Sequence, residues 1–216
     1  MDFPSVDLPA DIALRFTARA AAAPLALDAL PPGERAQTEE FGHEKRRRTF
    51  ALGRATARTL LAERLGVAAP DVPLRIAADG APELDGRPLH VSIAHAATVE
   101  RTLAVAAVGD RPLGVDLEPI RPRRPDLYRF LLHPDEYDLL ERLPLGHDAA
   151  QVLLWTLKEA TLKAMRTGFR VSPKKLRLDV APERAAATVS VEGGERWTLR
   201  YATRDDCYLA VAFPTP

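Results

Sequence analysis

The pattern of apolar and polar residues along the chain predicts two long helices among many short strands. Apolar residues recur near helical spacing over 43–65 and again over 148–166, with no proline inside either stretch. A first strand is predicted over 12–19, and the double proline at 31–32 opens a shorter helical region. Further strands are predicted over 74–77, 89–94, 103–108, 113–117, 176–180, 187–191, 198–202 and 208–213.

The two halves of the chain follow the same pattern. Each long helix is followed by a glycine, a proline and a strand, and each half ends in an alanine-containing apolar strand. This repeat predicts an α+β fold of two similar subdomains, 1–112 and 113–216, related by a pseudo-twofold axis. Each would pack a long helix on a small, mostly antiparallel sheet. The cleft between them is the expected ligand site.

Composition narrows the class of protein. The 216 residues contain 30 lysines and arginines and 30 aspartates and glutamates, so no strongly charged partner follows from the total. The single cysteine, Cys207, cannot form an internal disulfide and suits a reducing compartment. No apolar run is long enough to span a bilayer, and the N-terminus has no signal-peptide pattern. We therefore expect a cytoplasmic protein with no membrane partner.

Two stretches carry candidate chemistry. Asp116 and Glu118 alternate on one side of an apolar strand, and Glu159 and Lys163 lie one turn apart on the second long helix. Taken alone, the first pair suits a solvated strand edge and the second an exposed ion pair. Acids at the end of an apolar strand repel each other unless a cation lies between them. Three acids and a lysine therefore predict a magnesium ion that holds a phosphate ester.

The same two stretches resemble a known family. Residues 114–118 read G-V-D-L-E and residues 155–163 read W-T-L-K-E-A-T-L-K. They match, in order, the G-[VI]-D-x-E and [WF]-[STC]-x-K-E-[AS]-x-x-K motifs of the 4'-phosphopantetheinyl transferases. The chain most resembles the monomeric class that activates surfactin synthetase. The resemblance implies that Asp116, Glu118 and Glu159 are magnesium ligands, and that Lys158 and Lys163 bind the phosphates of coenzyme A.

Weaker matches extend over the first half. Residues 91–95 resemble the N-[IV]-S-H segment of the family, which implies that His95 contacts the 3'-phosphate of coenzyme A. Without the family, a strand-end histidine bonded to a backbone carbonyl is the simpler interpretation. Residues 50–54 resemble its F-x-x-G-R element, and by this resemblance Arg35 and Arg54 also bind the nucleotide. Ala81 and Ala94 depart from the family pattern and remove two usual contacts to coenzyme A.

Two groups of basic residues each allow two interpretations. The run 45–48 suits a nucleic-acid patch or a solvated helix face, but few aromatic residues accompany it. Arg121, Arg123 and Arg124, in the proline-rich stretch after Glu118, could face an acidic carrier protein or simply keep the protein soluble.

The resemblance predicts a magnesium-dependent transferase that acts for polyketide or nonribosomal peptide synthesis. It would move 4'-phosphopantetheine from coenzyme A to a serine of an apo acyl or peptidyl carrier protein and release 3',5'-ADP. Glu159 would take the serine proton, and Lys163 would stabilise the phosphoryl oxygens. We expect a monomer with no nucleic-acid partner. Two alternatives are a metal-dependent phosphodiester hydrolase acting on nucleic acid and a non-catalytic binder of coenzyme A or a nucleotide.

Overall fold

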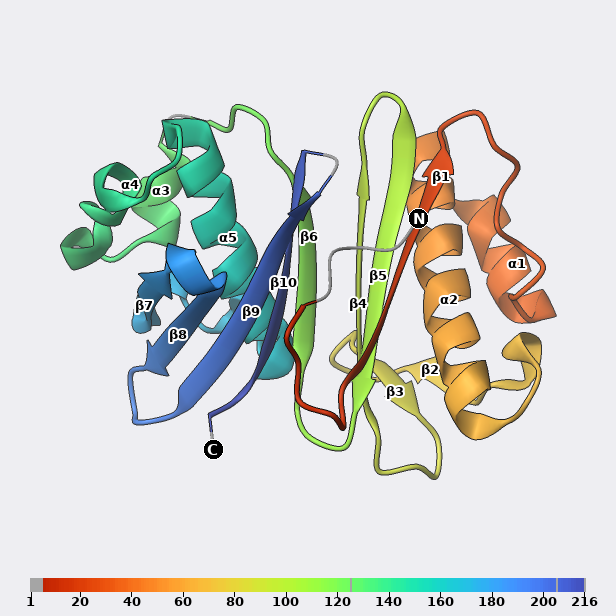
Figure 1. Cartoon of the computed structure of the whole chain (residues 1–216). Helices are drawn as coiled ribbons and strands as arrows, with labels where there is room; N and C mark the ends of the chain where they lie inside the picture. Colours follow the sequence, from red (N-terminus) through yellow and green to blue (C-terminus); the bar gives the residue numbers. More distant parts are fainter. Residues whose placement is uncertain (1–5, 125, 205, 216) are drawn as a thin grey trace. The chain divides into compact units, whose positions relative to one another are not determined.

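The structure of the protein is a computed structural model, which describes residues 6–124, 126–204 and 206–215. The chain forms two compact units, most of the first being Pro9–Asp110 and most of the second Arg111–Pro216 (Figure 1). This division falls two residues before the boundary expected from the sequence. Each unit consists of one five-stranded antiparallel sheet and its helices.

In the first unit the long helix α2 packs on the sheet. The helix ends at Gly66, whose φ of 69° gives the left-handed conformation that glycine adopts most readily. The strands lie in the order β1-β5-β4-β3-β2. The elements are β1 (Ala13–Ala20), α1 (Pro32–Glu40), α2 (Glu44–Leu65), the 3-10 turn η1 (Ala69–Asp71), β2 (Leu74–Ile76), β3 (Pro82–Leu84), β4 (His90–Ala97) and β5 (Arg101–Gly109).

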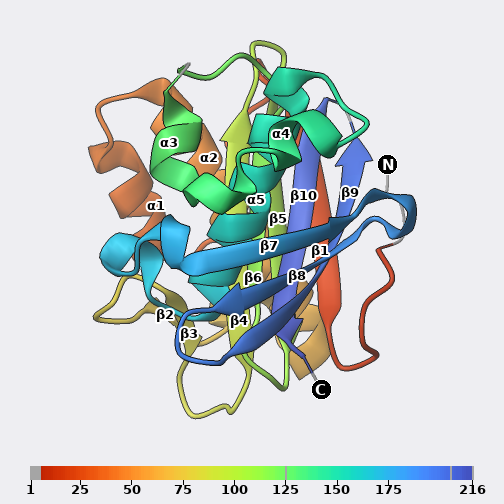
Figure 2. The same cartoon turned by 90° about the vertical axis from the view of Figure 1, so that its left-hand side faces the viewer.

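In the second unit the long helix α5 packs on the sheet, beside the short helix α4 (Figure 2). The strands lie in the order β6-β10-β9-β8-β7. The elements are β6 (Gly114–Pro119), α3 (Leu127–Leu131), η2 (Pro134–Glu136), α4 (Leu139–Arg142), α5 (His147–Ala164), η3 (Gly168–Arg170), η4 (Pro173–Lys175), β7 (Leu176–Ala181), η5 (Pro182–Arg184), β8 (Ala186–Val191), β9 (Arg196–Arg204) and β10 (Cys207–Pro214).

The two units have the same topology. Each begins with a strand, continues through a long helix, and ends in a four-stranded meander whose last strand pairs with the first. This arrangement confirms the α+β fold of two similar subdomains, each with a long helix on an antiparallel sheet. It also places Asp116 and Glu118 on the first strand of the second unit, as expected. The pseudo-twofold axis stays a prediction.

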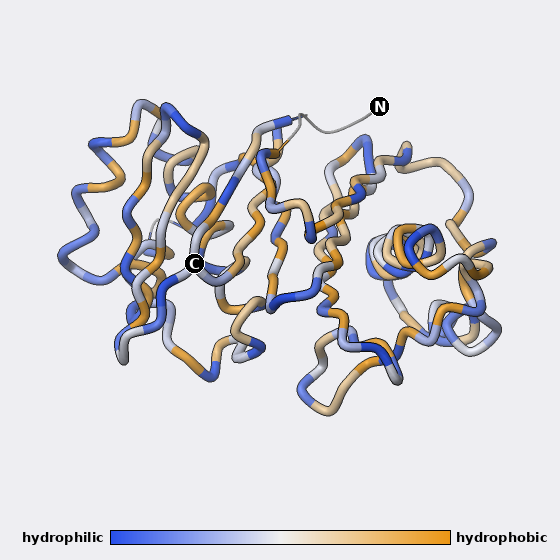
Figure 3. The backbone as a smooth tube through the Cα atoms, turned by 60° about the horizontal axis from the view of Figure 1, so that its bottom comes forward, coloured by the Kyte–Doolittle hydropathy of each residue, from blue (hydrophilic) through white to orange (hydrophobic). Residues whose placement is uncertain are grey.

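Each unit has its own apolar core between helix and sheet. In the second unit, leucines of α5 contact buried side chains of β7, β8 and β9, and Figure 3 shows hydrophobic residues, in orange, recurring along the helices and strands. The sequence prediction missed β3, which is only three residues long and begins with a proline. Among the described residues, no helix combines the length and apolar character needed to cross a membrane.

Candidate functional site

Strand β6 places two acids on one side of the sheet. Asp116 lies opposite Ala210 and Glu118 opposite Tyr208 in the pairing with β10. The side chain of Asp116 is only 7% exposed, and the side chain of Glu118 is 24% exposed. The two carboxylates point to the same side because successive residues of a strand alternate. That side faces α5, since Lys163 of α5 bonds to Asp116.

Gly114 sets the distance between β6 and α5. A Cβ atom at this position would lie 2.1 Å from the carbonyl oxygen of Ala160 and 2.4 Å from the amide nitrogen of Ala164. Both are backbone atoms of the helix, so no side chain can move aside. The glycine at the start of the G-V-D-L-E stretch therefore lets helix and strand approach closely enough for Lys163 to reach Asp116.

We expect Gly114→Ala to destabilise the second unit. The added methyl group must push α5 away from β6, and overpacking of this kind costs roughly 1 to 3 kcal/mol or more. Urea denaturation measures the loss. Gly33→Ala is the matched control, because nothing lies within 4 Å of its Cβ position and Gly33 lies in helix α1. Equal stability of the Gly114 variant and the wild type would show that the close approach is not required.

Helix α5 leaves a single stripe of its surface open. Over 150–164, a stretch that the structure describes in full, every side chain is buried except those of Trp155, Glu159 and Lys163. These residues are four positions apart and therefore lie one above the other on the helix. The ring of Trp155 lies 6.0 Å from the ring of Phe169 and 43° from parallel to it. The acid and the lysine thus share one partly open face with an aromatic cluster.

Lys163 connects the helix to the strand. Its Nζ donates a hydrogen bond of 2.8 Å to Oδ1 of Asp116. Burial disfavours the charged lysine, but Asp116, Glu159 and Glu118 outweigh that effect and raise the pKa of Lys163. Oδ2 of Asp116 is buried and has no hydrogen-bond partner. A buried carboxylate oxygen without a partner is costly, and a cation beside it would satisfy it.

The three acids act on one another electrostatically. Burial and then repulsion from Asp116 raise the pKa of Glu159 from 4.5 to about 7, against the attraction of Lys163. Burial and repulsion from Asp116 likewise raise the pKa of Glu118, whereas the positive charge of Arg123 acts to lower it. The acids of β6 and the acid of α5 are thus close enough to influence one another and Lys163 electrostatically, and Lys163 contacts Asp116 directly. The magnesium site of Asp116, Glu118 and Glu159 stays a prediction.

The site has the donors for a divalent cation but is not closed around one. Carboxylate oxygens are the ligands that magnesium prefers, and the unpartnered Oδ2 of Asp116 fits a cation. Across the described part of the chain, however, no three histidine, cysteine, aspartate or glutamate residues are grouped as ready metal ligands. Glu118 is instead ion-paired with Arg123. The carboxylates of the site fit magnesium chemically, but one of them, that of Glu118, is paired with Arg123.

Lys158, predicted to bind a phosphate, is buried in the structure. Its ammonium group donates to a carboxylate oxygen of Glu136 at 2.7 Å and to the carbonyl oxygens of Leu131 and Pro173 at 3.0 and 3.1 Å. These contacts use all three of its donors. Burial lowers the pKa of Lys158, although Glu136 opposes this effect. We interpret Lys158 as a structural residue that ties α5 to the segments around it.

The first unit contains the residues expected to hold the nucleotide. Arg35 is exposed, and its Nε donates to the carbonyl oxygen of Leu30 at 2.8 Å. His95 is exposed on β4, where its Cδ2 would lie 3.2 Å from a Cβ at Gly53. These two residues lie at the surface of the unit, where a ligand could reach them.

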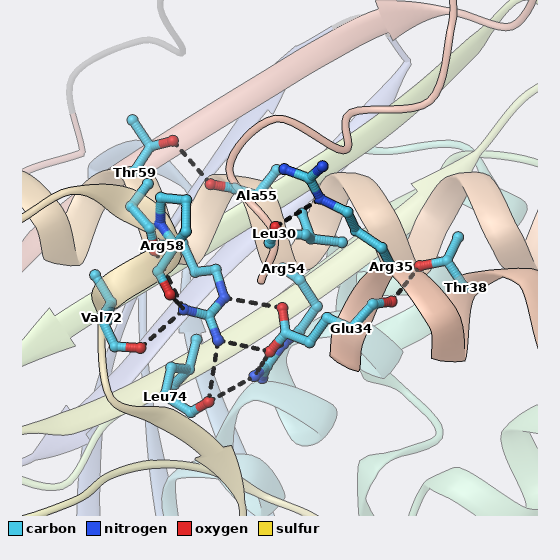
Figure 4. A network of polar contacts seen from close by, with 12 residues as sticks. Leu30, Glu34, Arg35, Thr38, Arg54, Ala55, Arg58, Thr59, Val72 and Leu74 are labelled. Carbon is cyan, nitrogen blue, oxygen red and sulfur yellow. Dashed lines mark hydrogen bonds and ion pairs between the residues drawn. The ribbon is translucent and has the colours of Figure 1, made fainter. Parts of the chain in front are cut away.

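Arg54 is not at the surface. It is 6% exposed, its guanidinium is paired with Glu34, and it donates to the carbonyl oxygen of Leu74 at 3.0 Å (Figure 4). Arg58, one turn later, also pairs with Glu34, at 2.8 Å. The sequence interpretation missed Glu34 and Arg58. The sequence pattern that could have indicated this ion pairing is two arginines four residues apart on α2 and an acid in the first turn of α1. Together they fix α1, which carries Arg35, to α2.

Comparison with known proteins agrees with this geometry. A model of the 4'-phosphopantetheinyl transferase superfamily matches residues 112–212, which include β6, α5 and all four acidic and basic residues of the site. The chain is 32% identical over 191 residues to the 4'-phosphopantetheinyl transferase HetI of Nostoc sp., covering 85% of this chain and 78% of that protein. It is 24% identical over 186 residues to a 4'-phosphopantetheinyl transferase of Bacillus subtilis, covering 85% and 81%. The protein belongs to the 4'-phosphopantetheinyl transferase superfamily.

Proposed function

We propose that the protein transfers 4'-phosphopantetheine from coenzyme A to a serine of an apo acyl or peptidyl carrier protein. The observation that carries this proposal is the gathering of Asp116, Glu118, Glu159 and Lys163 in the second unit of a chain from this superfamily. Three carboxylates and a lysine are the groups that phosphoryl transfer needs for a metal-bound pyrophosphate. We further propose that the protein is of the surfactin-synthetase-activating class, cytoplasmic and monomeric.

In the proposed reaction the serine hydroxyl oxygen attacks the phosphorus that carries the pantetheine arm. A new P–O bond forms, the bond to the second phosphate breaks, and 3',5'-ADP leaves. Magnesium, held by Asp116, Glu118 and Glu159, would neutralise the charge of the pyrophosphate. Glu159 takes the serine proton, and Lys163, which is partly exposed, pairs with a phosphoryl oxygen.

The nucleotide end of coenzyme A is assigned to the first unit. We propose that Arg35 and His95 contact its phosphates, since both are exposed. Arg54 supports this role indirectly, because its pairing with Glu34 fixes the helix that carries Arg35. Lys163 of the second unit is left as the lysine for the pyrophosphate, since the donors of Lys158 are engaged inside the unit.

Mass spectrometry of an apo carrier protein tests the proposal. Incubation with the protein, coenzyme A and magnesium should add one phosphopantetheine group to the carrier, and a chelator should prevent it. A carrier whose acceptor serine is replaced by alanine is the control and should stay unchanged. Nicked DNA without a mass gain would support the nucleic-acid hydrolase instead. Affinity for coenzyme A without turnover would support a binding protein.

A further inference from the structure

The connection after β6 places one arginine against the acidic site. Arg121 and Arg124 are exposed, the latter with 84% of its side chain accessible, whereas the side chain of Arg123 is only 19% exposed. The guanidinium of Arg123 is ion-paired with Oε2 of Glu118 and also donates to the carbonyl oxygen of Pro119 at 3.4 Å. Of the three arginines of this connection, Arg123 is thus the one held by a predicted metal ligand.

The charges of the site balance in two different ways. Asp116, Glu118 and Glu159 provide up to three negative charges, and Lys163 and Arg123 provide two positive ones. A divalent cation together with Lys163 already supplies three positive charges, so Arg123 becomes surplus. The carboxylate of Glu118 would then have to bind both the guanidinium of Arg123 and the metal ion. Repulsion between these two positive charges disfavours that arrangement.

We propose that Arg123 is the resident counter-ion of the metal site, which holds Glu118 in the absence of a divalent cation and releases it when the cation binds. This inference rests on the proposed magnesium site. Glu118 is ion-paired with Arg123, so it must leave the arginine before it can bind the cation. The unpartnered Oδ2 of Asp116 gives the incoming cation a ligand that is already in place.

The magnitudes allow this exchange. The side chains of Arg123 and Glu118 are 19% and 24% exposed, so their ion pair lies at the upper end of the range for exposed pairs, about 1 kcal/mol, and Arg123 can leave Glu118 at roughly that cost. Its neighbours Arg121, Pro122 and Arg124 are exposed. Competition of this size would weaken metal binding by roughly 3- to 10-fold, since 1.4 kcal/mol corresponds to tenfold.

The sequence around Arg123 offers a direct readout of its release. Trypsin cleaves after lysine or arginine but not before proline, and it must take the arginine side chain into its own pocket. Arg121 and Arg124 are each followed by proline, so the bond after Arg123 is the cleavable one in this connection. Cleavage there requires that Arg123 first leave Glu118, and its rate follows the population of the open form.

Limited trypsin digestion with and without manganese, a spectroscopic substitute for magnesium, tests the exchange. We expect manganese to accelerate cleavage after Arg123 by roughly 3- to 10-fold relative to cleavage after the exposed Arg142. Glu118→Gln should be cleaved rapidly after Arg123 under both conditions, because the pair is already broken. In parallel, electron paramagnetic resonance should show that Arg123→Gln binds manganese more tightly than wild type by the same factor. Arg124→Gln, which removes the same charge from the next residue, should bind it like wild type.

The outcomes separate this inference from the proposed function. Manganese that binds while cleavage after Arg123 stays constant or slows would show that Arg123 keeps its place, and would overturn the exchange alone. Equal tightening by Arg123→Gln and Arg124→Gln would reduce the effect to general charge and overturn it as well. No manganese binding at all would overturn the metal site and the exchange together, whereas transfer to a carrier protein is measured independently by mass.

Discussion

Glu159→Gln is expected to lower the rate of phosphopantetheine transfer by roughly 100- to 10,000-fold, the usual contribution of a general base. The substitution keeps the size of the side chain and removes both the proton acceptor and one charge of the proposed metal site. Steady-state kinetics with an apo carrier protein measures the loss as kcat/KM. Glu141→Gln, on the exposed surface of α4, is the matched control and should keep wild-type activity.

The stability of the metal-free protein provides an independent check on the same residue. The pKa of Glu159 rises from 4.5 to about 7 on folding, so the folded state binds its proton more tightly than the unfolded state. The resulting stability is present below pH 4.5 and is lost as the pH rises through about 7, at a cost on the order of 3 kcal/mol. Glu159→Gln should show a smaller pH dependence over this range. In the kinetic experiment, a kcat/KM of Glu159→Gln near that of the wild type would show that Glu159 does not act in the transfer.

Lys158→Met is expected to destabilise the protein by about 3 to 5 kcal/mol, because it leaves Glu136 buried without its cation. Glu136 would keep its hydrogen bonds from the amide nitrogens of His133 at 2.8 Å and Leu178 at 2.7 Å. For a chain of this length the loss corresponds to a fall in Tm of roughly 6 to 20 °C. Thermal denaturation followed by circular dichroism measures it.

A double variant distinguishes the structural role of Lys158 from a role in binding. Lys158→Met combined with Glu136→Gln removes both charges and should recover part of the lost stability. A residue that only binds phosphate would behave differently. Its loss would weaken coenzyme A binding in the folded protein and leave the Tm unchanged, and that result would restore the interpretation based on the family motif.

Most of the fold could be predicted from periodicity because long elements carry a long signal. Helix α2 was expected over 43–65 and is found at Glu44–Leu65, and α5 was expected over 148–166 and is found at His147–Ala164. The strand β3 could not be predicted, since three residues beginning with proline show no alternation. Its place between β2 and β4 depends on pairing with neighbours rather than on its own sequence.

The site was predictable where spacing fixes geometry. Alternation along a strand predicts that Asp116 and Glu118 share one side, and the helical repeat predicts that Glu159 and Lys163 share one face. The burial of Lys158 could not be predicted in this way, because its partner Glu136 lies 22 residues away in the 3-10 turn η2. Arg54 likewise was assigned to the ligand, whereas tertiary packing pairs it with Glu34. Basic residues within a motif do not by themselves reveal which of them face a ligand.

The two units make room for helix-to-sheet contact by opposite means. The first unit has its glycine on the helix, where Gly53 faces Ile93 and His95, and the second has it on the strand, where Gly114 faces α5. Their long helices are therefore not interchangeable, despite the shared topology. A chimera with α5 on the first sheet would place a helix without glycine against Ile93 and His95. Exchange of the helices is therefore expected to disturb the first unit less than an added methyl group at Gly114 disturbs the second, because Gly53 meets side-chain atoms at 3.2 and 3.3 Å and Gly114 meets helix backbone.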